Sequence, residues 1–254
     1  MINHMTTLGF QMQGEDDFLS LANYAYEHGT LMQTEQGAYV LLRVGGGAEL
    51  WLQLNREGVA IGMHPHFTGA GLMQIGIEAE ARHEDANELD GTFYAWAGAT
   101  PERPSHGLYA FLFDLPDRDR YGALAHPLVR QVQLAAFAHE LNVFEDAGAY
   151  ERDQLERRPG QLPLSPQSFI PQGLTEQGGD LIATAWIAGE VRRAGWIKNE
   201  LSGVYFQWAL VRTLGGDIDV VADERLVGER EIQEGDILSG TFWLSGRLVE
   251  AQAE

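Results

Sequence analysis

Short apolar runs separated by glycine-containing turns recur along most of this chain, and they constrain its fold more than any other feature. The run AELWLQL (48–54) is flanked by GAYVLLRV (37–44) and VAIGMHP (59–65), with the turns GGG and NREG between them. In AELWLQL, aliphatic side chains alternate with others such as Glu49 and Trp51, which is the period of a strand with two different faces. The pattern predicts three consecutive strands.

One amphipathic helix is expected before these strands. In EDDFLSLANYAYEHG (15–29), apolar residues recur at helical spacing, acidic residues fill the first turn and Gly29 follows the last turn. Acidic side chains complement the helix dipole at its N-terminus, and glycine commonly ends a helix. The preceding run TLGFQMQ (7–13) is expected to be a strand, so the predicted order is β-α-β-β-β.

The middle of the chain is less regular than its first part. Apolar residues from Leu134 to Leu141 recur at helical spacing, which predicts a helix over about 134–146. The segment LVRQVQL, which leads into this helix, fits a strand equally well. Upstream of it, three further runs predict strands, and they cover residues 72–82, 92–99 and 107–116.

A proline-rich segment divides the chain. Residues 157–180 hold four of the nine prolines and end in a glycine pair. Proline lacks a backbone donor and disfavours helix in the residue before it. We therefore expect a linker over 159–180 between two domains, residues 1–158 and residues 181–254. The expected fold class is α+β, with a mixed, mostly antiparallel first domain and a small β-barrel as the second.

Residues 181–250 resemble the OB-fold, with a glycine-bent first strand, a hairpin, a connection and a final strand pair. The resemblance implies a ligand or partner bound across one face of the barrel. Aromatic and basic side chains on such a face suit single-stranded nucleic acid. Alternatively, strand alternation places Trp208 on a core face with Leu210, where aromatic side chains fill the barrel. The candidate binding residues of this barrel are Tyr205, Trp208, Arg212, Trp243 and Arg247.

The β-α-β-β-β order of residues 7–65 is similar to one module of the vicinal-oxygen-chelate, or glyoxalase-like, superfamily. In that superfamily two modules form a cup that often holds a divalent metal. The resemblance implies metal ligands at Gln11 or Gln13 on the first strand and at His64 on the last.

The sequence HPH at residues 64–66 suggests the same chemistry independently. His64 and His66 are two residues apart at the end of a predicted strand, so their side chains project to the same side. Two imidazoles placed in this way can share a zinc or iron ion. The alternative is a turn in which both imidazoles are hydrogen bonded. Candidates for a third ligand are Glu49, His139 and Glu140.

Composition and missing motifs narrow the function classes. The chain has no cysteine, which excludes disulfides, thiolate metal sites and cysteine nucleophiles and fits a reducing cytoplasm. The net charge of −20 opposes nucleic-acid binding. P-loop, dinucleotide-binding and serine-hydrolase motifs are all missing. The sequence shows no secretory signal and no apolar run of membrane-spanning length.

We therefore predict a cytoplasmic binding protein without a catalytic constellation, which contacts a protein partner and no membrane. The contact surface is expected on the barrel or on the face that carries Trp51, unless a second layer of protein covers that face. The second hypothesis is a metal-dependent, glyoxalase-like enzyme or small-molecule binder that uses His64 and His66. The third is single-stranded nucleic-acid binding by the barrel.

Overall fold

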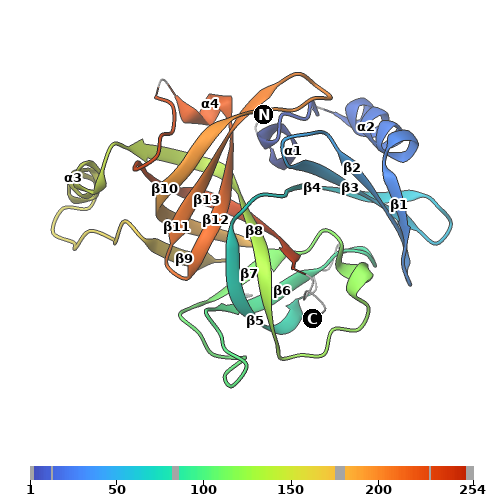
Figure 1. Cartoon of the computed structure of the whole chain (residues 1–254), viewed down its shortest axis with the longest axis horizontal. Coiled ribbons are helices and arrows are strands. Elements are labelled where there is room, and N and C mark those ends of the chain that lie inside the picture. The colour runs from blue at the N-terminus through green and yellow to red at the C-terminus, as the bar shows by residue number, and fades with distance from the viewer. Residues whose placement is uncertain (1–2, 13, 82–85, 175–180, 229, 250–254) are drawn as a thin grey trace.

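The computed structural model describes the chain except for residues 1–2, 13, 82–85, 175–180, 229 and 250–254. Its strands form two sheets (Figure 1). The smaller sheet has the order β1-β2-β3-β4, and all of its neighbouring strands are antiparallel. The three strands predicted between residues 37 and 65 are confirmed in this sheet. Its strands are β1 (Thr30–Gln33), β2 (Gly37–Arg43), β3 (Ala48–Asn55) and β4 (Ala60–Phe67).

The predicted amphipathic helix is confirmed as α2 (Glu15–His28), which packs on β2 and β3 of the small sheet. Leu21, Ala22 and Ala25 are buried against the sheet. Gly29 ends the helix where the chain passes close to β2, because a Cβ atom at this position would lie 2.5 Å from Val40 Cγ1. The acidic first turn and the terminal glycine therefore mark the ends of a helix that also packs on the small sheet.

The strand predicted over residues 7–13 is wrong. The chain forms the short helix α1 (His4–Thr7) there, and residues 8–12 join no sheet. The Asn3 side chain accepts a hydrogen bond from the Thr6 backbone, and the Thr6 hydroxyl accepts one from the Asn3 backbone, which together cap the helix. Leu8 and Phe10 are buried, so their alternation reflects core packing without strand pairing.

The larger sheet has nine strands in the order β11-β12-β8-β5-β6-β7-β13-β10-β9. Its strands are β5 (Leu72–Ala81), β6 (Thr92–Ala97), β7 (Ala110–Asp114), β8 (Leu128–Phe144), β9 (Ser168–Gln172), β10 (Thr184–Lys198), β11 (Tyr205–Thr213), β12 (Gly216–Asp223) and β13 (Ile237–Leu248). The remaining helices are η1 (Arg118–Tyr121), a 3₁₀ turn, with α3 (Ala147–Arg157) and α4 (Glu224–Val227). This mixture of strands and a few helices confirms the α+β class.

Two additional pairings, β8 with β13 and β10 with β11, close the larger sheet into two adjoining rings. One ring runs β10-β11-β12-β8-β13, and its β12–β8 pair is parallel. The other runs β5-β6-β7-β13-β8 and is closed by the single parallel bridge between Asp114 and Ser245. Strands β8 and β13 therefore belong to both rings.

The helix predicted over about 134–146 is wrong, because this segment is part of the 17-residue strand β8. Residues 132–138 are buried on both faces of the strand. Leu134 and Ala136 enter the core inside the rings, whereas Ala135 and Phe137 enter the core beneath the small sheet. A strand buried on both faces has no polar side, so apolar residues at helical spacing arise without a helix.

The predicted linker contains a strand, because β9 lies within residues 159–180 and pairs with β10. Strand β8 comes from the first predicted domain, yet it pairs with β12 and β13 of the second. The division of the chain into domains at residues 158 and 181 stays a prediction, but the sheet is continuous across it.

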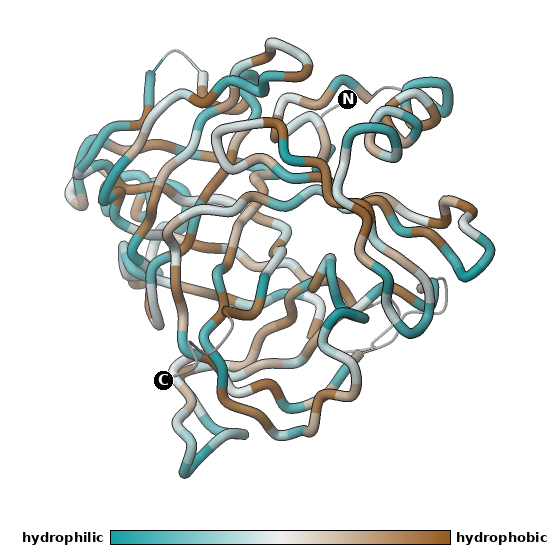
Figure 2. The backbone as a smooth tube through the Cα atoms, turned by 45° about the vertical axis from the view of Figure 1, so that its right-hand side comes forward, coloured by the Kyte–Doolittle hydropathy of each residue, from teal (hydrophilic) through white to brown (hydrophobic). Residues whose placement is uncertain are grey.

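Two large cores organise the molecule. One fills the rings, and the other lies between the small sheet, α2 and the outer surface of β8, β11 and β13. The small sheet and α2 lie on one side of the molecule, and α3 lies on the other (Figure 1). Hydrophobic residues follow the strands, whereas the turns are largely hydrophilic (Figure 2). The second core packs the small sheet against the rings. The candidate site lies between the small sheet and one of the rings.

Candidate functional site

A cavity of about 900 Å³ lies between the small sheet and the ring that contains β5, β6 and β7. The small sheet contributes residues of β3, β4 and the β1–β2 turn, and the ring contributes residues of β5, β6, β7 and β13. Loops 86–91 and 115–123 complete the described part of the wall. The side chains that decide its chemistry are Glu35, Gln53, His64, Glu80, Asn87, Glu88, Asp90, Thr92, Asp114, Arg118, Asp119, Trp243 and Ser245.

The described wall is strongly acidic. Six of its residues are aspartate or glutamate, against a single arginine, Arg118. That arginine is already neutralised, because its Nε and Nη2 atoms donate to the two carboxylate oxygens of Glu80 at 3.1 and 2.9 Å. Besides Glu80, the described wall therefore carries five further carboxylates.

Asp114 stands at the end of β7, where three strands bring polar side chains together. Thr92 is its neighbour on β6, and Ser245 is its neighbour on β13. The Thr92 hydroxyl donates to Asp114 Oδ1 at 2.5 Å, and the Trp243 indole donates to Asp114 Oδ2 at 2.6 Å. These donors orient a carboxylate at the wall without neutralising its charge.

His64 and Asp90 form a second oriented pair. His64 Nε2 lies 2.9 Å from Asp90 Oδ1, and the same oxygen accepts a hydrogen bond from Gln53. Burial alone would raise the pKa of Asp90, but the hydrogen bond and charge of His64, with the bonds from Gln53 and the Asn87 backbone, lower it overall. Asp90 is therefore ionised and only accepts, so His64 Nε2 carries the proton.

A glycine makes room for this arrangement. A Cβ atom at Gly62 would lie 2.1 Å from Gln53 Oε1. That oxygen accepts a hydrogen bond from Asn87 at 2.7 Å, while the Gln53 amide nitrogen donates to Asp90. Gly62 therefore lets Gln53 link the small sheet to the loop that carries Asp90.

His66 points into a different environment and is fully buried. Its Nε2 atom bonds Gln133 Oε1 and its Nδ1 atom bonds Ser245 Oγ, both at 2.8 Å. Gln133 in turn donates to Asp219. Burial, with the positive charge of Arg247, lowers the pKa of His66 to about 3. His66 is thus a neutral member of a closed hydrogen-bond chain.

Among the described residues, the predicted metal ligands are not brought together around one point. Both nitrogens of His66 are occupied, and His64 binds Asp90 through Nε2. The third-ligand candidates lie in other contacts: Glu49 accepts from Arg43, and His139 bonds His4. No contact ties Glu140 to the histidine pair among the described residues, which contain no group of three acidic or histidine side chains able to hold a metal. Gln11 lies outside any strand, and Gln13 lies outside the described residues.

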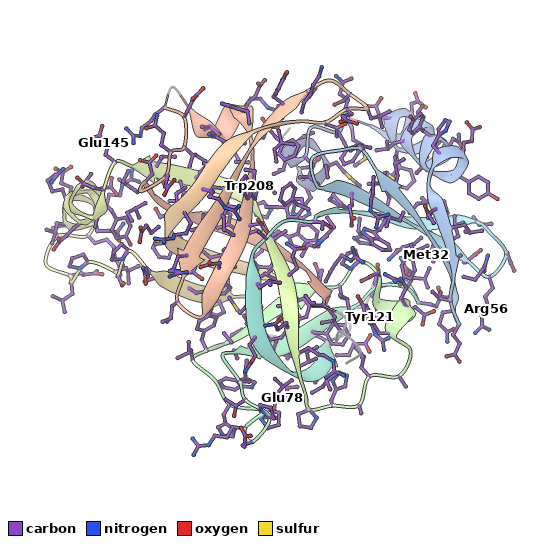
Figure 3. The ribbon with its side chains drawn as sticks, in the orientation of Figure 1. Met32, Arg56, Glu78, Tyr121, Glu145 and Trp208 are labelled. Carbon is purple, nitrogen blue, oxygen red and sulfur yellow. The ribbon has the colours of Figure 1, made fainter. Side chains whose placement is uncertain are left out.

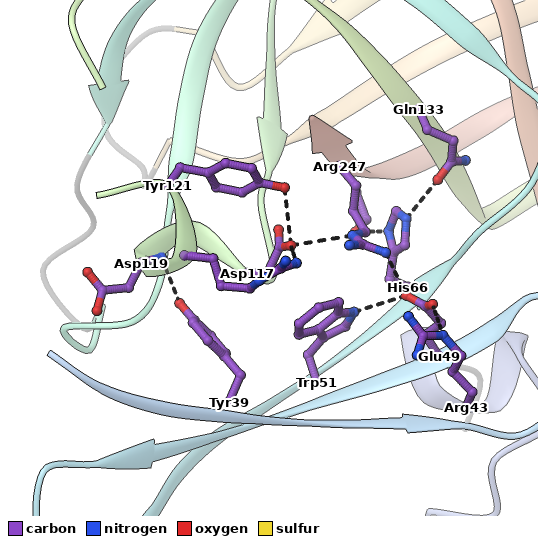
Figure 4. Close-up of polar contacts among 12 residues, drawn as sticks. Tyr39, Arg43, Glu49, Trp51, His66, Asp117, Asp119, Tyr121, Gln133 and Arg247 are labelled. Carbon is purple, nitrogen blue, oxygen red and sulfur yellow. Dashed lines mark hydrogen bonds and ion pairs between the residues drawn. The ribbon is translucent and has the colours of Figure 1, made fainter. Parts of the chain in front are cut away.

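An ionic cluster with two buried carboxylates, Glu49 and Asp117, lies beside the cavity and joins the small sheet to β13 (Figure 4). Glu49 accepts hydrogen bonds from Arg43, Arg247 and the Trp51 indole. Arg247 also lies 3.4 Å from Asp117, whose carboxylate is paired with Arg120. Each acidic group here faces two arginines. We call these residues the Glu49–Arg247 cluster.

Trp51 is fully buried, so the face that carries it is covered by a second layer and is not a contact surface. Tyr39 and Leu41 of the same face, with Leu89, form a small core with Trp51. The Arg247 guanidinium lies over the Trp51 ring, 4.9 Å from its centroid. The burial of Trp51 agrees with the alternative interpretation, in which a second layer of protein covers this face.

The candidate residues of the barrel do not form one surface. Trp208 packs toward the small sheet, near Phe67, and donates to Asp219 (Figure 3). Trp243 and Arg247 lie at the cavity and in the Glu49–Arg247 cluster. Only two of the five have substantial exposure: Tyr205 is half exposed, and Arg212 is paired with Asp217.

The Ser245–His66 contact resembles a nucleophile beside a general base, but its chemistry does not fit that role. A general base works best when its pKa lies near the operating pH. His66 is protonated only near pH 3, and its second nitrogen faces an amide instead of a carboxylate. The contact therefore orders the wall of the cavity and does not activate Ser245.

The HPH motif pointed to one residue of the cavity, His64. The carboxylates were missed, because Asp90, Asp114 and Asp119 lie on separate segments of ordinary acidic composition. The sequence NELDG (87–91) carried a turn signal in Asp90–Gly91 that marks the loop, but nothing there indicates that it faces β4.

Comparison with protein-family models, curated proteins and solved structures finds no match for this chain. Among the described residues, no helix has the length and apolar character needed to cross a membrane.

Proposed function

We propose that this chain binds a small organic cation in the acidic cavity. The observation that carries the proposal is the charge of the described part of the wall, where six carboxylates face one arginine that Glu80 already neutralises. A volume of about 900 Å³ is within the range of small-molecule sites. The net charge of −20 also draws cations toward the protein. This function is related to the small-molecule binder of the second hypothesis, but of its two histidines only His64 lines the described wall of the cavity.

Calorimetric titration with spermidine at low salt tests the proposal. The variant Glu35→Gln/Glu88→Gln removes two exposed carboxylates of the wall. We expect about tenfold weaker binding, since two such groups contribute roughly 1–2 kcal/mol in total. The matched control, Glu57→Gln/Glu151→Gln, makes the same change in net charge away from the cavity and should bind spermidine as the parent does.

Equal weakening in the two variants would contradict the proposal, because it would show attraction to the overall charge without a specific site. Citrate, a trivalent anion, serves as a probe of opposite charge. Binding of citrate comparable to that of spermidine would also count against an acidic recognition site.

A protein partner is a second proposal, favoured by exposed apolar side chains near α2. Leu19 and Tyr26 are two helical turns apart on α2, and Leu31 lies on the adjoining strand β1. Strand β1 is at the edge of the small sheet, and edge strands can pair with another chain. Cytoplasmic location is likewise proposed from the sequence alone.

We also infer that the ring β10-β11-β12-β8-β13 is an OB-like barrel. The inference is supported by its five strands and by the register shift between Val191 and Arg193, which bends β10 between Gly189 and Gly195. Its predicted stacking residues are dispersed, so the cavity carries the stronger functional proposal.

A further inference from the structure

The edge strands of the two sheets differ in the residues that protect them from further pairing. Among the described residues, three strands pair with a neighbour on one side only, and these are β1, β4 and β9. Proline, which lacks a backbone donor, stands in two of them, as Pro65 in β4 and Pro171 in β9. Strand β1 has the sequence TLMQ, with neither a proline nor a charged residue. It lies at the outer end of the small sheet without the residues that commonly block an edge (Figure 1).

The register of β1 against β2 shows which backbone groups of β1 face away from the sheet. The Thr34 N–H donates to the Gly37 carbonyl oxygen, 2.9 Å from the nitrogen, so these two residues form a hydrogen-bonded pair. In an antiparallel ladder, such pairs alternate with pairs whose backbone groups point away from the partner strand. The backbone groups of Met32 therefore face β2. Those of Leu31 and Gln33 point to the open edge, which presents two N–H and two C=O groups.

Leu31 also offers an apolar side chain beside this edge. It lies opposite Val40, a member of the core that α2 helps to form, so its side chain is on the same face of the sheet as that core. Helix α2 packs on β2 and β3, the next strands inward, and Leu31 is 52% exposed. Outward-facing backbone groups beside an apolar side chain are the features that recognise an added strand.

The surroundings of β1 are acidic, which sets the charge of a partner. Residues 14–36, which contain α2 and β1, hold five acidic residues and neither lysine nor arginine. Among them, Glu27 precedes β1, Glu35 follows it, and both are exposed. Arg56 donates to Gln36 beside this segment and offsets only one of its charges. The net charge of the segment favours a basic partner and opposes a second copy of this chain, which would bring the same acidic residues.

We propose that β1 binds an extended, basic peptide segment of a partner protein by strand addition. The segment pairs its backbone with Leu31 and Gln33, rests an apolar side chain on Leu31 and carries lysine or arginine toward the acidic surroundings of β1. This inference rests on the second proposed function, a protein partner, because it specifies where and by which chemistry that partner binds. It does not depend on cation binding in the cavity.

Selection of random heptapeptides displayed on phage, against the immobilised parent protein, tests the chemistry of the partner. We expect the enriched peptides to carry lysine or arginine and to alternate apolar with polar residues, as an added strand on a two-faced sheet requires. Binding of a synthetic copy of the most enriched peptide is then measured by fluorescence anisotropy.

Two variants at one position separate backbone pairing from side-chain contact. Leu31→Pro removes the outward N–H but keeps an apolar side chain and the bonds of β1 to β2, because that N–H does not face β2. Leu31→Ala keeps the N–H and removes most of the side chain. We expect peptide binding to weaken about tenfold or more in Leu31→Pro and about threefold in Leu31→Ala. Thermal unfolding of both variants identifies any loss of binding that comes from misfolding.

Methylation of the peptide backbone repeats the test on the unchanged protein. In an added strand, the N–H groups of alternate residues face the neighbouring strand, and the others face away. Peptides methylated singly at successive backbone nitrogens should therefore alternate between weakened binding and the binding of the unmethylated peptide.

The outcomes distinguish this inference from the protein-partner proposal. Enriched peptides that bind Leu31→Pro as tightly as the parent, without alternation on methylation, would overturn the role of β1 and leave the partner proposal intact. If no peptide were enriched over an unrelated protein, both would fall. Enrichment of peptides without lysine or arginine would overturn the charge assigned to the partner. Dimerisation of the parent that is lost in Leu31→Pro, measured by analytical ultracentrifugation, would make a second copy the occupant and overturn the peptide.

Discussion

The Glu49–Arg247 cluster and the acidic cavity use the same kinds of side chain with opposite charge balance. In the cluster, Glu49 is paired with Arg43 and Arg247, and Asp117 is paired with Arg120 and Arg247. Among the described residues that line the cavity, one arginine faces six carboxylates. The two regions adjoin each other, since β13 and the segment after β7 contribute to both.

The difference separates charges that hold the fold from charges that are available to a ligand. The acidic groups of the cluster are buried and have partners within the chain, so the cluster fixes the small sheet against β13. The carboxylates of the cavity outnumber the basic side chains of its described wall, so they repel one another and would gain from a bound cation. Proteins commonly accept such local instability at binding sites.

The largest expected effect comes from breaking the cluster. Arg247→Met removes the guanidinium shared by Glu49 and Asp117, and it leaves both carboxylates buried with fewer partners. We expect a loss of about 3–5 kcal/mol in the free energy of unfolding, measured by urea denaturation. Arg157→Met removes an exposed i,i+4 pair with Asp153 and should cost less than about 0.5 kcal/mol. Similar losses of unfolding free energy in the two variants would show that the cluster contributes no more to stability than an exposed ion pair.

Acid should weaken the closed hydrogen-bond chain of His66. The folded pKa of about 3 lies below the ordinary value of 6.5, so the unfolded chain binds the extra proton between these pH values. The stabilisation is complete above pH 6.5 and is lost as the pH falls toward 3. From pH 6.5 to 5, the parent should lose about 2 kcal/mol more stability than His66→Gln, which cannot titrate there. Parallel stability curves for the two proteins would show that His66 protonates freely in the fold.

The smallest effect on stability is expected in the cavity. Glu35→Gln/Glu88→Gln reduces repulsion among the carboxylates and should leave the free energy of unfolding unchanged or raise it by less than about 1 kcal/mol. Urea denaturation measures this value beside the weaker cation binding of the same variant. A clear loss of stability would instead assign these carboxylates to the fold.

Much of the fold could be predicted where local signals decided the structure. The acidic first turn and Gly29 delimit α2, and glycine-containing turns delimit β2, β3 and β4. The prediction of helix or strand failed in segments whose secondary structure depends on contacts with distant parts of the chain. Strand β8 is apolar on both faces because two cores enclose it. Helix α1 is set by reciprocal capping hydrogen bonds between Asn3 and Thr6.

The candidate site was less predictable than the fold. HPH identified His64 as chemically notable, but the shared metal role required a third ligand that the folded chain does not provide. The partner of His64 is Asp90, which lies 26 residues later in a loop. Periodicity within a strand gives the direction of a side chain, whereas the residue that it meets depends on how separate segments pack.

The sharing of β8 and β13 by both rings has a mechanical consequence. Neither ring can open along these strands without removing a side of the other, and β8 joins chain segments on both sides of residues 159–180. A hinge between the two halves of the sequence is therefore excluded while β8 stays paired.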